Sequence, residues 1–65
     1  MADHHLTTPA PRALTDALKS ALACILGAEA LSTYRPDAAE VSALLDGVER
    51  YLAQARAALA ATEGA

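Results

Sequence analysis

The sequence contains no phenylalanine, no tryptophan and only one cysteine, Cys24. A single cysteine excludes an internal disulfide framework, which many small domains use in place of a large core. The chain also has no cluster of cysteine and histidine with the spacing of a structural zinc site. Because 65 residues form one small domain of marginal stability, we expect oligomerisation or a partner protein to supply the missing stability.

Positive charge is also scarce, and it is scattered. The net charge is −3, and the five basic residues are Arg12, Lys19, Arg35, Arg50 and Arg56. A nucleic-acid-binding protein concentrates lysine and arginine on one face, so nucleic acid is not the expected partner. The longest uncharged stretch after Lys19 covers residues 20–28, far short of the roughly 20 residues that span a bilayer. We therefore expect a soluble, cytoplasmic protein without a membrane partner and without a signal peptide.

Alanine and leucine dominate what is present, with eighteen and ten residues respectively. Both are strong helix formers, whereas the β-branched and aromatic residues that favour strands are few. The fold class predicted is all-α. We expect a flexible polar tail over residues 1–8, helices over about 9–32 and 38–61 joined by a turn over 33–37, and a short tail over 63–65.

The turn has the clearest local signals. Pro36 biases Arg35 away from helical geometry, which ends the first helix. Asp37 and Glu40 then have the spacing of a capping box, with Asp in place of the usual Ser or Thr. These signals predict a tight connection between two helices.

Apolar residues at helical spacing form two rows in the first helix and one in the second, and the small-residue row and the row of the second helix follow the 4-3 step of a heptad. The large-residue row of the first helix comprises Leu14, Leu18, Leu22 and Ile25. The small-residue row beside it comprises Ala17, Ala21, Cys24, Ala28 and Leu31. The row of the second helix comprises Val41, Leu45, Val48, Leu52, Ala55, Leu59 and Thr62.

A hairpin that folds at Arg35 pairs residues whose numbers sum to about 70. Under this rule Ile25 faces Leu45 and Leu22 faces Val48, and both pairs are apolar. This agreement favours an antiparallel helical hairpin. We assign the hairpin core to Leu14, Leu18, Leu22, Ile25, Val41, Leu45, Val48, Leu52 and Leu59.

The small-residue row then has no match inside the hairpin. Together with Leu44 and Tyr51, it predicts a second apolar surface, formed by Ala17, Ala21, Cys24, Ala28, Leu31, Leu44 and Tyr51. The simplest use of such a surface is assembly into a dimeric four-helix bundle or packing on a larger protein. The expected partners are a second copy of the chain, as a homodimer, a larger protein, or both.

No residue pattern predicts catalysis or a cofactor. If Met1 is removed, the amine of Ala2, two backbone amides and the imidazole of His4 form a set of ligands that suits Cu(II) or Ni(II). This motif is short and arises often by chance, so a disordered polar tail is the simpler interpretation. Cys24 is expected to be a small buried hydrophobe and Glu29 a solvated carboxylate. Tyr34, Arg35 and Tyr51 have two interpretations, recognition or packing, because Tyr and Arg are enriched at interface hot spots.

The function predicted is a non-catalytic interaction module, such as a small bacterial adaptor, regulator or co-chaperone. The alternatives are a small regulator that contacts nucleic acid or neutralises a partner as antitoxins do, and an N-terminal Cu- or Ni-binding protein. No motif identifies a family. In architecture alone, the expected hairpin resembles the small dimeric regulators of the Rop type and the two-helix co-chaperones of bacterial secretion systems. The Rop-type resemblance does not extend to RNA binding, since a basic, aromatic helix face is absent.

Overall fold

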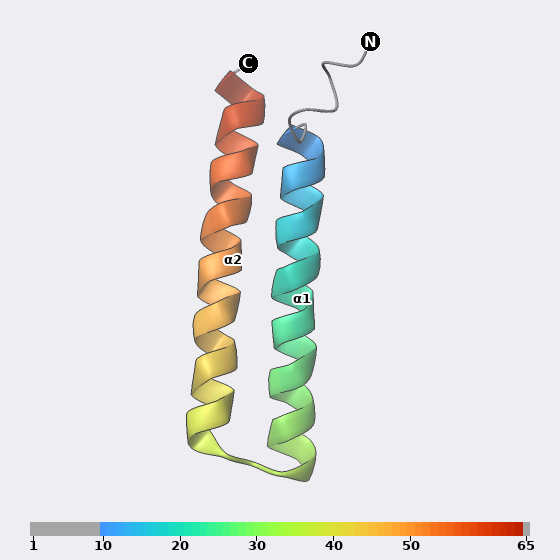
Figure 1. Ribbon diagram of the computed structural model, residues 1–65, viewed down its shortest axis with the longest axis vertical. Coiled ribbons are helices and arrows are strands. Elements are labelled where there is room, and N and C mark those ends of the chain that lie inside the picture. The colour runs from blue at the N-terminus through green and yellow to red at the C-terminus, as the bar shows by residue number, and fades with distance from the viewer. Residues whose placement is uncertain (1–9, 65) are drawn as a thin grey trace.

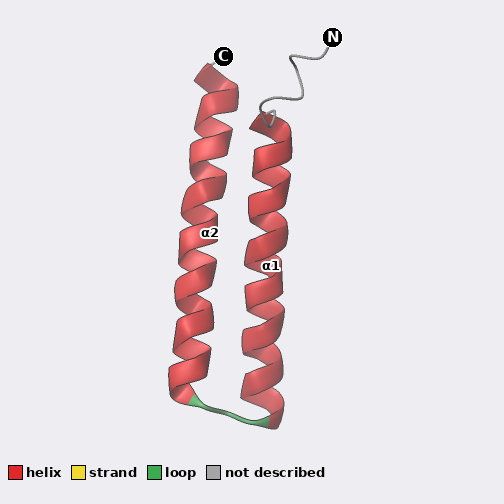
Figure 2. Cartoon of the chain, in the orientation of Figure 1, coloured by secondary structure: helices red, strands yellow, loops and turns green. Residues whose placement is uncertain are grey.

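The chain forms an antiparallel hairpin of two long helices that pack side by side (Figure 1). In this computed structural model, residues 10–64 are described, and side-chain surroundings are described for residues 12–62. Helix α1 spans Ala10–Tyr34 and helix α2 spans Ala38–Gly64. A short loop joins them at one end, so the beginning of α1 and the end of α2 lie together at the other (Figure 2). The predicted all-α hairpin is confirmed.

Both helices are longer at their C-terminal ends than the sequence predicted. Helix α1 continues to Tyr34 because the restriction imposed by Pro36 acts on Arg35 alone. The N–H of Arg35 donates to the carbonyl oxygen of Leu31 at 2.9 Å, which closes the last turn. Helix α2 ends at Gly64 and not near Ala61, and no described glycine has a positive φ. Residues 63 and 64 therefore belong to α2 and not to a C-terminal tail, whereas residues 1–9 of the predicted N-terminal tail lie outside the described part of the chain.

The start of α2 has the predicted cap. The N–H of Glu40 donates to Oδ1 of Asp37 at 3.1 Å, and the N–H of Val41 donates to the carbonyl oxygen of Asp37 at 2.9 Å. The reciprocal arm of a capping box is replaced by another contact, because the Glu40 carboxylate accepts a hydrogen bond from Nη2 of Arg35 at 2.9 Å. The Asp37 side chain thus satisfies one of the free first-turn amides of α2, that of Glu40, and Arg35 ties the turn to the same end of the helix.

The interior of the hairpin is made of small residues. Among the residues whose burial is described, the buried apolar side chains are all alanine, at 3–7% exposure: Ala17, Ala21, Ala28 and Ala55. Side chains this small let the backbones of two helices approach closely. The consequence is a tight contact that removes little apolar surface from water.

Two glycines of the hairpin show how close this approach is. A Cβ atom added to Gly47 would lie 2.9 Å from Sγ of Cys24, and one added to Gly27 would lie 3.3 Å from Cδ1 of Leu44. In both contacts the two residue numbers sum to 71, which confirms the antiparallel register predicted near 70. Gly47 is needed because the Cys24 sulfur fills the space where a side chain would begin.

Candidate interaction surface

The roles of the two rows of α1, which one is buried in the hairpin and which one lies outside, are the reverse of the sequence prediction. The small-residue row, assigned to a partner interface, lies inside the hairpin: Ala17, Ala21 and Ala28 are buried, and Cys24 and Leu31 are half-buried. Leu44 and Tyr51 of the same predicted interface are also half-buried, and Leu44 packs beside Gly27. That assignment was wrong, because helices joined by a short turn pack most closely through their smallest side chains.

The assignment of the hairpin core was wrong for six of its nine members, for the complementary reason. Six members of that predicted core are 43–53% exposed: Leu18, Leu22, Ile25, Leu45, Leu52 and Leu59. The remaining three, Leu14, Val41 and Val48, are half-buried. Two packed helices bury only the stripe along which they touch, so large residues beside that stripe keep about half of their area in water.

These large residues share one face of the hairpin. In the helical period of 3.6 residues, Leu14, Leu18, Leu22 and Ile25 lie to one side of the buried alanines of α1. Leu45, Leu52 and Leu59 lie to one side of Ala55 in α2, and the groove described next shows that the two sides coincide. We refer to the seven residues as the leucine face: Leu14, Leu18, Leu22, Ile25, Leu45, Leu52 and Leu59.

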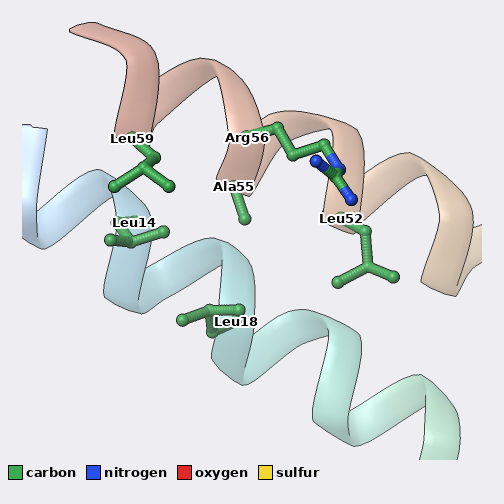
Figure 3. A pocket seen from close by; sticks show the side chains of 6 residues that line it. All are labelled: Leu14, Leu18, Leu52, Ala55, Arg56 and Leu59. Atoms are coloured by element: carbon green, nitrogen blue, oxygen red, sulfur yellow. The ribbon is translucent and has the colours of Figure 1, made fainter. Parts of the chain in front are cut away.

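A groove runs between the helices on the leucine face, near the open end of the hairpin. It has a volume of about 410 Å³ and is lined from both helices (Figure 3) by Leu14, Leu18, Leu52, Ala55, Arg56 and Leu59. Five of these six lining residues are aliphatic, and Arg56 is the charged one. The groove can therefore receive aliphatic side chains beside an acidic one.

The opposite sides of the two helices carry smaller or polar groups. Ser20 and Gly27 lie on the other side of the buried alanines in α1, and Gly47 and Gln54 lie on the other side of Ala55 in α2. The exposed large aliphatic side chains are thus gathered mainly on one of the two broad faces of the hairpin, whereas Leu44 is half-buried against Gly27 on the other side. Leu26, which is 58% exposed, lies outside the leucine face on the outer side of α1.

Three residues had two interpretations, recognition or packing, and the structure shows how exposed each of them is. Tyr34 is 84% exposed, and Arg35 is exposed and bound to Glu40. Tyr51 is half-buried. Tyr51 therefore contributes to packing of the hairpin, whereas Tyr34 lies free on the surface at the end of α1.

The described residues that were considered for catalysis or metal binding do not form a common site. Glu29 is exposed, and its carboxylate accepts a hydrogen bond from Oγ1 of Thr33 at 3.2 Å. Cys24 is a free, half-buried thiol that packs on Gly47. Within residues 10–64, no three metal-ligating side chains come together. The predicted copper or nickel ligand His4 lies outside the described residues.

Neither α1 nor α2 has both the length and the apolar character needed to cross a bilayer. No protein-family model, curated protein or solved structure matches the chain. What the chain offers for a functional interpretation is therefore its own geometry, and the most distinctive part of that geometry is the leucine face.

One signal in the sequence could have distinguished the two rows of α1. Gly47 interrupts a helix that is otherwise rich in good helix formers, and an interior glycine costs about 1 kcal/mol relative to alanine. A glycine that permits close approach of the helices is expected to face a residue of the small-residue row. Because facing residues have numbers that sum to about 70, Gly47 is expected to face Cys24 or its neighbour. Size complementarity across the turn, and not only hydrophobicity, identifies the face that is buried.

Proposed function

We propose that this protein is a non-catalytic interaction module and that the leucine face is its binding surface. The observation that supports the proposal is the inverted distribution of size: alanines fill the hairpin interior, while six large aliphatic residues remain 43–53% exposed on one face. Isolated exposed leucines are ordinary on protein surfaces, but a contiguous apolar face marks a place of association. A small adaptor or regulator uses such a face to bind another protein.

The exposed area is large enough to support binding. With about half of roughly 170 Å² exposed per side chain, six residues offer about 500 Å², the order of one side of a small specific interface. At about 25 cal/mol per Å², covering this area gains about 12 kcal/mol before the costs of association. Those costs are about 4–15 kcal/mol, so the leucine face can support association only if most of it is covered at once.

Covering the face also supplies the stability that the hairpin interior lacks. Four buried alanines remove little apolar area from water compared with the conformational entropy of ordering two helices. A partner that covers the leucine face binds the folded hairpin and not the unfolded chain, so it stabilises the fold. The proposal therefore links the fold and the function through one surface.

The test compares two surface changes of equal chemistry. Leu18→Gln combined with Leu52→Gln removes apolar area from the middle of the leucine face, and Leu26→Gln removes a leucine that is 58% exposed and lies outside it. The mass of each full-length protein is measured by sedimentation velocity, and the host proteins it retains are identified by mass spectrometry. We expect the double variant to lose the associations that the wild-type chain and Leu26→Gln both show. A double variant that keeps every association of the wild-type chain would refute the proposal.

A further inference from the structure

We propose that the occupant of the leucine face is a second copy of this chain, bound face to face and antiparallel. In this arrangement α1 lies on α1 of the second copy, α2 lies on α2 of the second copy, and the two turns are at opposite ends. The inference rests on the proposed function, since it names the partner of the same surface. It follows from the spacing of the large residues, from the distribution of charge along the hairpin and from the area available.

The leucine face is nearly symmetric about a single level of the hairpin. In α2, Leu45 and Leu59 lie seven residues on either side of Leu52. A two-fold axis at Leu52, perpendicular to the helices, therefore places Leu52 on Leu52 of the second copy and Leu45 on its Leu59. A closed dimer needs a self-complementary surface of this kind.

The large residues of α1 are symmetric about nearly the same level of the hairpin, which supports the axis independently of α2. Contacts across the hairpin pair residues whose numbers sum to 71, so the level of Leu52 corresponds to residue 19 of α1. The midpoint of Leu14 and Ile25 lies between residues 19 and 20, and that of Leu18 and Leu22 lies at residue 20. One rotation thus brings Leu14 onto Ile25 and Leu18 onto Leu22, within about one residue of the axis that serves α2. The groove between Leu14, Leu18, Leu52 and Leu59 then receives side chains from the half of the second copy nearer its turn.

Charge favours the antiparallel arrangement over the parallel one. About the axis at the level of residue 19 and Leu52, residues 20–51 form the half nearer the turn, and they carry five acidic and two basic residues, a net charge of −3. Residues 10–18 and 53–64 form the other half, and they carry two basic and two acidic residues, a net charge of zero. Antiparallel stacking places the acidic half of each copy toward the neutral half of the other, whereas parallel stacking places two acidic halves together.

One pair of charges on the leucine face follows the same axis. Arg56 and Glu49 are both exposed, and each lies beside the row of Leu45, Leu52 and Leu59. Their numbers are centred between residues 52 and 53, so the rotation places Arg56 of one copy on Glu49 of the other, twice per dimer. The polar group in the groove thereby gains an acidic partner.

The area agrees with a dimer of modest size. Two copies of the leucine face bury about 1,000 Å² in total, the lower end of what specific interfaces need. Because the interface is small, the dimer should form at micromolar concentration, and its helicity should rise with concentration.

Disulfide formation between engineered cysteines tests the arrangement directly. In a full-length Cys24→Ala background, Leu52→Cys lies on the axis and should link two identical chains under mild oxidation. Leu45→Cys or Leu59→Cys alone should not link, since identical positions are then about 21 Å apart along the helix axis and a disulfide needs Cα atoms within about 7 Å. An equimolar mixture of Leu45→Cys and Leu59→Cys should link. A disulfide that forms readily between two Leu45→Cys chains would overturn the proposed register. The antiparallel arrangement would be overturned if Leu52→Cys formed a disulfide with Leu18→Cys and not with a second Leu52→Cys chain.

Exchange of the charged pair is the second measurement. We expect Arg56→Glu and Glu49→Arg each to weaken dimerisation by about tenfold, and the double variant to recover most of this loss, because the pair forms between copies. Failure of the double variant to recover dimerisation would overturn the contact. A wild-type chain that is still monomeric at a concentration 100-fold above micromolar would overturn the dimer. The proposed function would nevertheless stand if a host protein binds the wild-type chain and Leu26→Gln but not the Leu18→Gln/Leu52→Gln variant.

Discussion

The contact between Cys24 and Gly47 offers a quantitative test of which row of α1 is buried. Replacing Gly47 with alanine improves helix propensity by about 1 kcal/mol. The added Cβ would lie 2.9 Å from Sγ of Cys24, well inside the roughly 3.5–4.0 Å of a favourable contact between non-bonded heavy atoms. Overpacking of this kind costs about 1–3 kcal/mol. We therefore expect Gly47→Ala to lower the free energy of unfolding by about 0–2 kcal/mol in spite of its better propensity.

The same geometry predicts that removing the sulfur reverses the effect. In a Cys24→Ala background, the nearest atom that remains is the Cβ of residue 24, at 3.9 Å from the added Cβ, which is an ordinary contact. Gly47→Ala should then raise the free energy of unfolding by about 1 kcal/mol through propensity alone. The double-mutant cycle should give a coupling of about 1–3 kcal/mol between positions 24 and 47.

The assay is urea denaturation of the four proteins at one fixed protein concentration, followed by circular dichroism. The fixed concentration matters because self-association would add to the apparent stability of every variant. Gly27→Ala is the control, since its Cβ would meet only the end of the flexible Leu44 side chain, at 3.3 Å; it should be neutral or stabilising. A coupling energy near zero would show that Cys24 and Gly47 do not touch, and the interior of the hairpin would then have to be reassigned.

Two further predictions concern the hairpin interior and the cap of α2. Ala21→Glu places a charge at a position that is 3% exposed, so this variant should lose its cooperative helical signal as well as association. Ala23→Glu, at an exposed position, should retain the helical signal. Equal helicity of the two variants in circular dichroism would contradict the assigned interior. Asp37→Ala should cost about 1 kcal/mol through loss of the hydrogen bond to the Glu40 amide, and Asp37→Asn should cost little because asparagine caps equally well. Equal denaturation midpoints for these two variants would show that the cap does not contribute.

The sequence determined the class of the fold, the position of the turn and the register. Alanine and leucine content made helices the only regular structure available, and Pro36 with Asp37 placed the break between them. These are local effects of propensity, proline sterics and capping, which act whatever the helices pack against. The length of the turn then set the register, because an antiparallel hairpin with so short a connection has little freedom to slide.

The packing of the two helices, and not their hydrophobic periodicity, decided which face of each helix is buried. Both rows of α1 recur at helical spacing, the large-residue row in steps of 4, 4 and 3 and the small-residue row in steps of 4, 3, 4 and 3, so hydrophobic periodicity did not single out the row that the hairpin buries. The choice depends on how closely two backbones can approach, and that is a property of the pair: Cys24 fits on Gly47 and Leu44 fits on Gly27, whereas leucine facing leucine would hold the helices apart. Small residues therefore form the interior of the hairpin, and the large ones remain on the outside, where a further chain can cover them.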